Sequence, residues 1–293
     1  MTPATSGLPG AGWKDPAMWM LAPATLFVLL VFVYPFLDGL ILSFHPLNGG
    51  GALANYIAFF SDPRLWPTIG TTMKLALPAT IVNVGIAVPL AYRLRHKTPY
   101  QKIATTIITI PLTLGTVLIA QGMLSYFGPN GWFSQVVQAL HLWDGPVRLT
   151  HNYWGVLISL VISGFPFVFL LVLSYITGID PVLARAAATL GANPLRQFRH
   201  VVFPLMLPGL AMAFALAFVQ AFSVFPSAVL LGAPSGPTRV ISIAAYEAAF
   251  ENYDYSMASA IAMIMGVVQL GVVALVLGLR RLAYRGPATG GKG

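Results

Sequence analysis

The polar side chains of this apolar sequence that could do chemistry are isolated residues, not clusters. Five of them fall within long hydrophobic stretches: Lys74, Asn83, Gln121, Gln220 and Ser223. Polar groups within a membrane are expensive to bury and are therefore candidates for contact with a solute. We predict that these five residues lie along a translocation pathway. Such residues more often have another role: uncharged ones form hydrogen bonds between helices, and Lys74 could extend its ammonium group outward to the membrane surface.

Enzyme active sites find no support in the sequence. The chain has no cysteine, which excludes thiolate metal sites and cysteine nucleophiles. No His-x-x-x-His pair occurs, and no G-x-x-x-x-G-K-[ST] loop that could cradle the phosphates of ATP. We therefore predict no catalytic residues, no metal site and no cofactor. The five histidines lie in loops or at the ends of hydrophobic stretches: His45, His96, His141, His151 and His200.

The composition indicates that these residues belong to a membrane protein. Of the 293 residues, 57% are hydrophobic and 8% are charged, whereas a soluble domain carries about 25% charged residues. The mean hydropathy of +0.78 is that of a polytopic membrane protein. The net charge is +8, but no basic stripe interleaved with aromatics lies outside the hydrophobic stretches, so we predict no nucleic-acid partner.

Six stretches are long enough to cross the hydrocarbon core as helices, which need about 20 residues. Their backbones must hydrogen-bond internally, so the predicted fold class is all-α with six transmembrane helices. The fifth stretch carries Gln220 and Ser223. The predicted spans are 18–44, 67–92, 103–127, 153–176, 202–230 and 257–280.

Lys and Arg are unevenly distributed between the two sides of these spans. Arg64, Arg148 and Arg239 lie on the side opposite the termini. Cytoplasmic loops carry the excess of basic residues, so both termini are predicted to be cytoplasmic. The chain then divides into a cytoplasmic segment 1–17, a transmembrane domain 18–283 and a disordered tail 284–293. The twelve basic residues on the side of the termini are Lys14, Arg93, Arg95, Lys97, Lys102, Arg185, Arg196, Arg199, Arg280, Arg281, Arg285 and Lys292.

The cytoplasmic segment between the fourth and fifth spans, DPVLARAAATLGANPLRQFRHVVFP, predicts a helical hairpin. Asp180 can cap free N–H groups, and the proline that follows it suits the first helical position. Gly191 supplies a stop, and Asn193 with its following proline repeats the start signal. The first helix is too short to be stable alone in water, so it must pack against something.

One apolar stripe runs along that first helix. Its members Leu183, Ala186, Ala187 and Leu190 are spaced as residues on one helix face. The side chains are small and suit close approach by a partner surface. Packing against the protein's own membrane helices would use the same stripe.

The spacing of the hairpin resembles a known motif. Arg185-Ala-Ala, three residues, Gly191, nine residues, then Val201-x-Phe203-Pro204 is similar to the EAA motif of binding-protein-dependent ABC transporter permeases. That motif is Glu-Ala-Ala, three residues, Gly, nine residues, then Ile-x-Leu-Pro. The resemblance extends over residues 18–283 and implies the type I ABC importer permease fold in a bacterial inner membrane.

In that family, residues 180–192 would form a coupling helix that docks on a cytoplasmic ATPase. The resemblance implies two ATPase subunits, a second permease subunit that is identical or homologous, an external solute-binding protein and surrounding lipid as partners. Arg185 stands where the family usually has Glu, so an acid on the partner ATPase is a hypothesis for this chain. The residues implied in coupling are Asp180, Leu183, Arg185, Ala186, Ala187, Leu190, Gly191 and Arg196.

The resemblance also bears on the solute. Residues 188–192, 228–234 and 238–241 are similar to the polyamine-type branch of these permeases, which implies a polyamine-like substrate. Relatives in that branch carry thiamine, iron or aminophosphonates, and these substrates stay open. A secondary transporter is a further alternative. It would need ionisable residues in mid-span and often has internal repeats, neither of which is clear here.

Overall fold

The computed structural model describes residues 16–47, 49–95, 98–128, 131–140 and 149–283. Within these ranges the chain is helical or irregular and contains no strand. Most of the predicted N-terminal segment and the predicted tail lie outside the described residues. Six described helical stretches are long and apolar enough to cross a membrane, which confirms the all-α, six-span fold class. They are Leu21–Ser43, Pro67–Leu94, Pro99–Ala139, Tyr153–Thr177, Pro194–Phe222 and Tyr255–Arg280.

The helices follow one another with short connections. The first span consists of α1 (Pro16–Val28), a π-helix (Leu29–Val33) and α2 (Tyr34–Ser43), and the fifth consists of α9 (Pro194–Gln197), a π-helix (Phe198–Val202) and α10 (Phe203–Phe222). A third π-helix (Glu247–Glu251) follows α12. The other helices are α3 (Ala54–Ser61), α4 (Pro67–Leu94), α5 (Pro99–Phe127), α6 (Trp132–Ala139), α7 (Tyr153–Thr177), α8 (Pro181–Thr189), α11 (Pro226–Leu231), α12 (Ile241–Tyr246) and α13 (Tyr255–Ala283).

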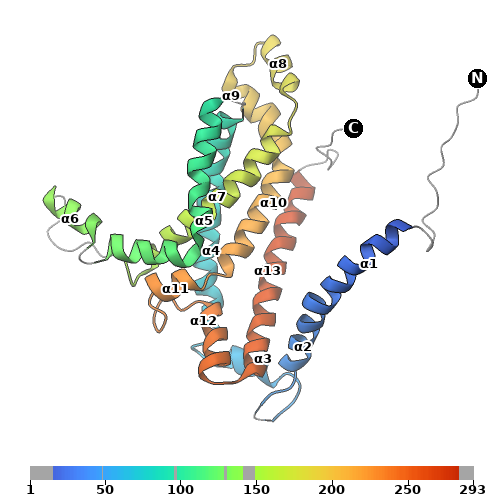
Figure 1. Ribbon diagram of the computed structural model, residues 1–293, viewed down its shortest axis with the longest axis vertical. Coiled ribbons are helices and arrows are strands. Elements are labelled where there is room, and N and C mark those ends of the chain that lie inside the picture. The colour runs from blue at the N-terminus through green and yellow to red at the C-terminus, as the bar shows by residue number, and fades with distance from the viewer. Residues whose placement is uncertain (1–15, 48, 96–97, 129–130, 141–148, 284–293) are drawn as a thin grey trace, which may run out of the picture.

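The centre of the bundle is the packing of α4 against α7, with α5 and α10 beside them (Figure 1). Ala87 and Ala91 of α4 are fully buried against Val168 and Phe169 of α7. Lipid tails are as apolar as these helices, so the hydrophobic effect does not drive the helices together within a membrane. Small side chains let two helix backbones approach closely, and this close packing stabilises their association. This packing fixes the central helices from which the polar side chains project.

The first span differs from the others because its most apolar window has none of its residues buried. Figure 1 shows α1 leaning away from the bundle, whereas α2 packs against α13. A helix of this hydropathy cannot face water, so its surface must be covered by lipid or by another membrane subunit.

Two of the π-helices lie directly before a proline. One ends at Val33, just before the turn that contains Pro35, and the other ends at Val202, before Pro204. Proline lacks an N–H and its ring clashes with the carbonyl four residues earlier in an α-helix. The wider π turn accommodates that carbonyl, so both spans continue through their prolines.

The bend in the third span is caused by a glycine and not by the proline in the same helix. Gly115 has φ 70° and ψ 162°, a conformation that only glycine adopts without strain. Figure 1 shows α5 turning sideways in its second half, towards α6. The helix continues through Pro111 and departs from helical geometry at Gly115.

The fifth span was predicted over 202–230, and this extent is wrong at both ends. The helix begins at Pro194, because the second arm of the hairpin continues into the membrane without a break. It ends at Phe222. Phe225 is then held outside the helical region by the proline that follows it, and α11 starts as a separate short helix.

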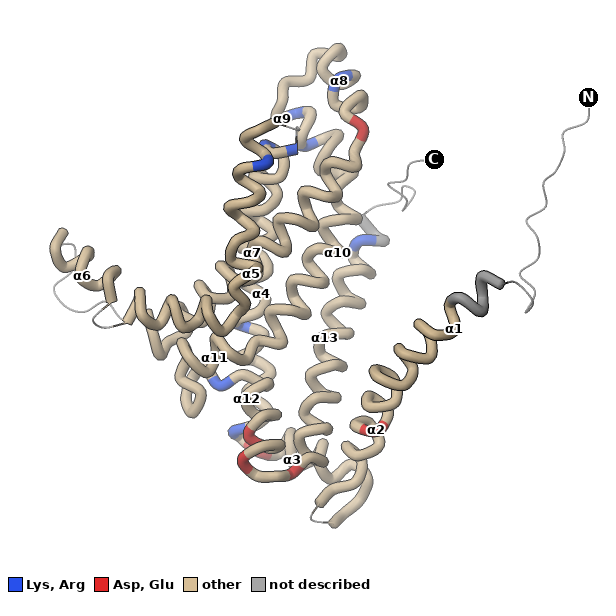
Figure 2. The backbone as a smooth tube through the Cα atoms, in the orientation of Figure 1, with Lys and Arg blue, Asp and Glu red and all other residues tan. Residues whose placement is uncertain are grey.

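The charge distribution agrees with the predicted orientation. Figure 2 shows basic residues around α8, α9 and the end of α13, and acidic residues around α12 and α3 at the opposite end. The positive-inside rule assigns the end with α8 and α9 to the cytoplasm. The helical hairpin therefore projects on the cytoplasmic side.

Candidate functional site: a projecting hairpin and an inner polar cavity

The hairpin of residues 180–204 has the helix starts and the stop that its sequence predicted. The Asp180 carboxylate accepts a hydrogen bond from the Val182 N–H at 2.8 Å, and the Asn193 side-chain oxygen accepts one from the Arg196 N–H at 2.8 Å. Both prolines occupy first helical positions. Gly191 has φ 84°, the left-handed conformation expected of a helix stop.

The turn between the two arms is closed by its own hydrogen bonds. The Ala192 N–H donates to the Ala187 carbonyl at 3.0 Å, and the Gly191 N–H donates to the Ala188 carbonyl at 2.9 Å. This pair of bonds is the Schellman motif, which satisfies carbonyls at the end of a helix. Gln197 Nε2 also donates to the Ala192 carbonyl at 2.8 Å. The hairpin is therefore held in one conformation by its own hydrogen bonds.

The predicted apolar stripe of α8 is divided between two faces. Leu183, Ala186 and Leu190 are exposed, and Leu190 is 89% exposed at the end of the molecule where α8 projects beyond the bundle (Figure 1). Ala187 is half-buried instead. The neighbouring Ala184, which the stripe omitted, packs on the core beside Phe198. The helix is turned about its axis so that Ala184 and Ala187 face the protein, whereas Leu183, Ala186 and Leu190 face away from it.

Arg185 does not belong to the exposed apolar edge. It lines an opening of ≈ 450 Å³ at the base of α8, together with Asp180, Arg95 and Gln197. The guanidinium of Arg95 lies 4.0 Å from the centre of the Tyr92 ring, and that ring packs edge-on against Phe198 at 4.7 Å. These contacts join the base of the hairpin to the cytoplasmic end of α4. The predicted Arg196 is exposed on the second arm.

A small cavity with several polar side chains in a largely apolar lining lies among α4, α5, α7, α10 and α11. Its volume is ≈ 90 Å³, and three of the five predicted pathway residues line it: Asn83, Gln220 and Ser223. The structure thus brings together residues that lie 140 positions apart in the sequence. The polar residues that line the cavity are uncharged: Asn83, Thr116, Ser163, Gln220, Ser223 and Ser227.

Asn83 is the most constrained of these polar groups. Its side chain is 3% exposed, and its Nδ2 lies 3.5 Å from the Leu160 carbonyl as a weak donor. Its Oδ1 has no hydrogen-bond partner among the described residues. A buried acceptor without a partner costs about 1–3 kcal/mol. Asn83 lines the cavity, so a shift of the surrounding helices that uncovers Oδ1 would let a solute or a water molecule donate a hydrogen bond to it.

Lys74 and Gln121, the other two predicted pathway residues, do not line this cavity. Lys74 is exposed on α4, and its backbone carbonyl accepts a hydrogen bond from the Tyr153 hydroxyl at 2.8 Å. Gln121 is exposed on α5 beyond the bend at Gly115. Their positions along the sequence could not show which helix face each would occupy.

Three cavity residues were missed in the sequence because small hydroxyl side chains are common in membrane helices. Thr116 follows the glycine that bends α5. Ser163 lies next to Gly164, where a β-carbon would approach Asn83 Nδ2 to 2.8 Å. Ser227 shares a hydrogen bond of 2.8 Å with Ser159 of α7. The nearby glycines were the available signal, since they mark close approaches of the backbone.

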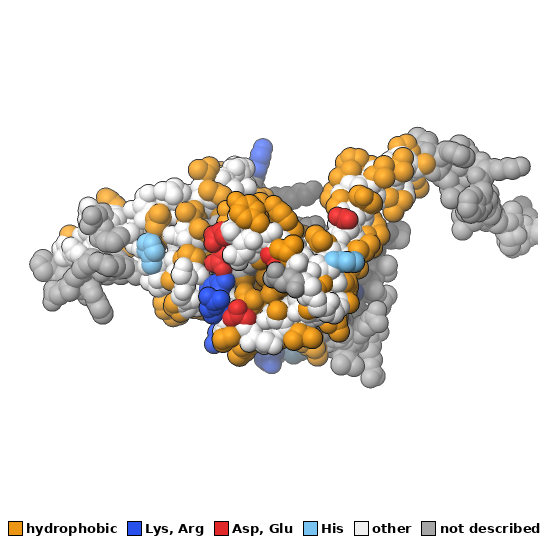
Figure 3. Space-filling model, turned by 90° about the horizontal axis from the view of Figure 1, so that it is seen from below, with side chains coloured by type: hydrophobic (Ala, Val, Ile, Leu, Met, Phe, Trp, Pro, Cys, Tyr) orange, Lys and Arg blue, Asp and Glu red, His pale blue; other side chains and the backbone are white. Residues whose placement is uncertain are grey.

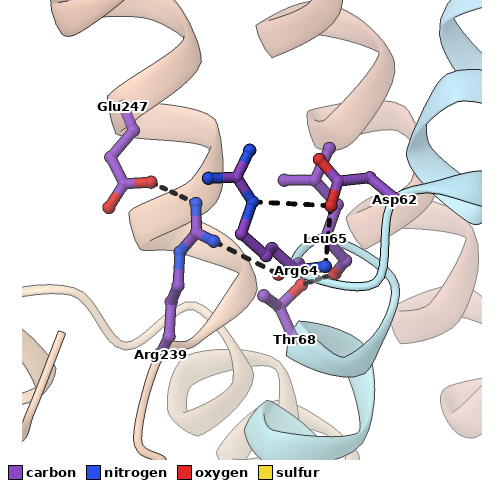
Figure 4. Close-up of polar contacts among 6 residues, drawn as sticks. All are labelled: Asp62, Arg64, Leu65, Thr68, Arg239 and Glu247. Carbon is purple, nitrogen blue, oxygen red and sulfur yellow. Dashed lines mark hydrogen bonds and ion pairs between the residues drawn. The ribbon is translucent and has the colours of Figure 1, made fainter. Parts of the chain in front are cut away.

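A network of polar contacts joins two loops at the external end (Figure 4). Arg239 forms an ion pair with Glu247, and its Nη1 donates to the Arg64 carbonyl at 3.2 Å. Arg64 in turn lies 3.7 Å from the Asp62 carboxylate. Figure 3 views this end and shows acidic and basic side chains together amid hydrophobic ones. The network connects the start of the second span to the segment before the sixth.

Six apolar spans, four of which enclose a cavity with polar side chains in its lining, and a capped hairpin that projects from the cytoplasmic end define a membrane transport subunit. Residues 83–283 match the family described as "Binding-protein-dependent transport system inner membrane component". The chain belongs to this family and is therefore a multi-pass permease component of an inner membrane.

Curated relatives carry different solutes according to their names. The chain is 27% identical over 269 residues to a probable starch degradation products transport system permease of Thermoanaerobacterium thermosulfurigenes, covering 88% of this chain and 91% of the relative. It is 26% identical to a sulfate transport system permease of Salmonella typhimurium, covering 84% and 85% of the two chains. A spermidine/putrescine transport system permease of Haemophilus influenzae is 28% identical, covering 71% and 76%.

Solved structures share the fold. A chain of a bacterial alginate ABC transporter, solved in complex with an alginate-bound periplasmic protein, has a TM-score of 0.80 at 21% identity, covering 94% of this chain and 97% of that chain. A chain of the MetNI methionine ABC transporter has a TM-score of 0.60 at 17% identity, covering 77% and 100%. These likenesses confirm that the fold is that of ABC transporter permeases.

Proposed function

We propose that this permease imports a small polar solute by alternating access, driven by a separate cytoplasmic ATPase that docks on α8. The observation that carries this proposal is the exposed apolar edge of α8, with Leu190 almost uncovered outside the membrane. A large apolar group kept in water on a rigid, capped helix favours burial by a partner protein. ATP would supply the differential affinity for inward- and outward-facing states.

The complex would contain two ATPase subunits, a second permease subunit and an external solute-binding protein. The uncovered surface of the first span supports a second permease subunit, identical or homologous, that shares this surface with lipid. The relative solved with a periplasmic protein supports a binding protein at the external end. ATP hydrolysis would belong to the separate subunits, and this chain would supply no catalytic residue. The transmembrane domain would extend over 18–283.

The solute is proposed as small and polar, and the polyamine-like assignment is one of several that the relatives support. Their names include starch degradation products, sulfate and spermidine/putrescine. The inner cavity offers amide and hydroxyl groups, which bind polar solutes by hydrogen bonds. A secondary transporter is less well supported, because the cavity has no ionisable side chain that could couple a proton or ion gradient.

Deletion of residues 181–191 tests the docking of the ATPase. We expect the wild-type permease to co-purify with its ATPase and the deleted form to lose it, because the deletion removes the entire exposed edge. Size-exclusion chromatography of the two forms in detergent measures whether the membrane domain remains folded. A folded, deleted permease that retains its ATPase and its transport activity would refute the proposal.

Replacement of Arg185 by glutamate tests the role of the reversed charge. If the partner ATPase presents an acid to Arg185, the Arg185→Glu variant should lose about 100-fold in solute-stimulated ATP hydrolysis, since placing two like charges together costs a few kcal/mol. Arg199→Glu is the matched control, because it reverses the charge of an exposed arginine on the second arm that is not among the residues implied in coupling. Unchanged ATP hydrolysis and transport in Arg185→Glu would exclude an electrostatic role for this residue.

A further inference from the structure

Asp38 is an acidic residue within the first membrane span. It lies five positions before Ser43, the last residue of α2. At 1.5 Å per residue this places it about 7–8 Å from the external end of the helix. Figure 2 shows the acidic position on α2. Its side chain is exposed and forms no ion pair or hydrogen bond with the described residues.

The carboxylate lines a groove between α2, α13 and the segment that contains α12. The groove has a volume of ≈ 630 Å³, and Gly39 and Ser259 also line it. Four aromatic rings contribute to the same groove from three other parts of the chain. They are Phe225, Tyr246, Phe250 and Tyr255.

Three of these rings form one connected surface. The Tyr246 ring lies 5.0 Å from Phe225 on one side and 5.0 Å from Phe250 on the other, between ring centres. Tyr246 and Phe250 are exposed, as is Tyr255 at the start of α13. Ring faces carry partial negative charge, so neighbouring rings beside a carboxylate form a surface that attracts a cation.

An aromatic belt at the membrane surface would explain the rings but not the acid. Exposed Tyr and Phe at the end of a span commonly face the headgroups. A carboxylate at this depth, in contrast, is not stable against lipid, and intramembrane acids face a water-filled cavity or a partner. The acid and the rings line one groove, so a single occupant should satisfy both.

We infer that Asp38 and these aromatic rings bind the ammonium group of an organic cation as it enters the permease. The inference rests on the proposed import function and specifies the class of solute. A primary or quaternary ammonium group would pair with the Asp38 carboxylate and lie over the Tyr246 and Phe250 rings. An anion such as sulfate would be repelled there.

The position of the groove relative to the inner cavity supports a route for the solute. Phe225 lines both spaces, so the groove and the cavity that contains Asn83 adjoin at this residue. Ser242, which lines the groove, donates a hydrogen bond to the Val224 carbonyl, and Val224 lines the cavity. A solute would thus be selected by charge in the groove and then held by neutral hydrogen bonds deeper in the membrane.

Uptake by the complete transporter in proteoliposomes, with its ATPase and its binding protein, tests the inference. The probes are labelled putrescine and choline, with maltose and sulfate as a neutral and an anionic comparison. We expect uptake of an ammonium probe, and a loss of about tenfold or more in Asp38→Asn, because hydrogen bonds to charged groups contribute about 1.5–3 kcal/mol. Asp38→Glu should retain most of the uptake.

The control variant is Glu251→Gln, which removes an external carboxylate that does not line this groove. ATP hydrolysis stimulated by the binding protein is measured in parallel, so that failure of the import function is seen separately. If maltose or sulfate is taken up and neither ammonium probe is, the cation site is overturned and the import function is retained. Equal uptake of an ammonium probe by wild type and Asp38→Asn has the same meaning. Loss of the second permease subunit in Asp38→Asn would also overturn the cation site, because Asp38 would then belong to the subunit interface. Absence of both uptake and stimulated hydrolysis in the wild type would overturn the import function itself.

Discussion

Replacing Leu190 with aspartate should abolish ATP-driven uptake while the permease remains folded and inserted. Leu190 is 89% exposed in the isolated chain, so the change removes little contact within the subunit. At the proposed ATPase interface the same side chain would be buried. Losing a buried leucine removes about 1.5–3 kcal/mol, and an unpaired carboxylate there adds a desolvation penalty of several kcal/mol. Together these predict at least about a 100-fold loss of uptake.

Two further variants separate docking from a general effect of charge. Leu190→Met keeps an apolar side chain of similar volume and should retain most of the activity. Thr189→Asp places the same charge on the neighbouring residue, outside the exposed apolar edge, and should have a much smaller effect. Thermal unfolding in detergent should be equal in all three variants. Full uptake by a folded Leu190→Asp transporter would contradict the docking of α8.

The hairpin could be predicted from the sequence because its signals are local. Asp180, Gly191 and Asn193 each act within four residues of their own position, through caps and a left-handed turn. Such interactions do not depend on the remainder of the fold. The face that α8 turns towards the protein was not predicted, because it depends on the packing of Ala184 against the core beside Phe198, at the start of the fifth span.

The inner cavity, unlike the hairpin, could not be predicted from local signals in the sequence. Asn83, Gln220 and Ser223 were identified only as polar residues within apolar stretches, which does not show whether they meet. Their convergence depends on the packing of α4, α7 and α10. Lys74 is also a polar residue within an apolar stretch, but it does not line the cavity. The groove at Asp38 was missed because its acid and its rings belong to segments about 190 or more residues apart.

Replacing Asn83 with leucine should lower transport without lowering stability. The Asn83 Oδ1 is buried without a partner in the described structure, so its removal relieves a cost of about 1–3 kcal/mol. The melting temperature of the purified permease should therefore stay the same or rise. The hydrogen bond from the solute is lost at the same time, so uptake should fall about 5–100-fold, mainly through a raised KM.

Thr80→Val is the matched control on the same helix. Thr80 is also fully buried, but its hydroxyl donates to the Ala76 carbonyl of its own helix at 2.8 Å and does not line the cavity. This variant should leave KM for uptake unchanged. Opposite movements of stability and transport in Asn83→Leu would distinguish a solute contact from a packing residue, since a packing residue would lower both. A folded Asn83→Leu permease with wild-type KM would show that the solute does not use this acceptor.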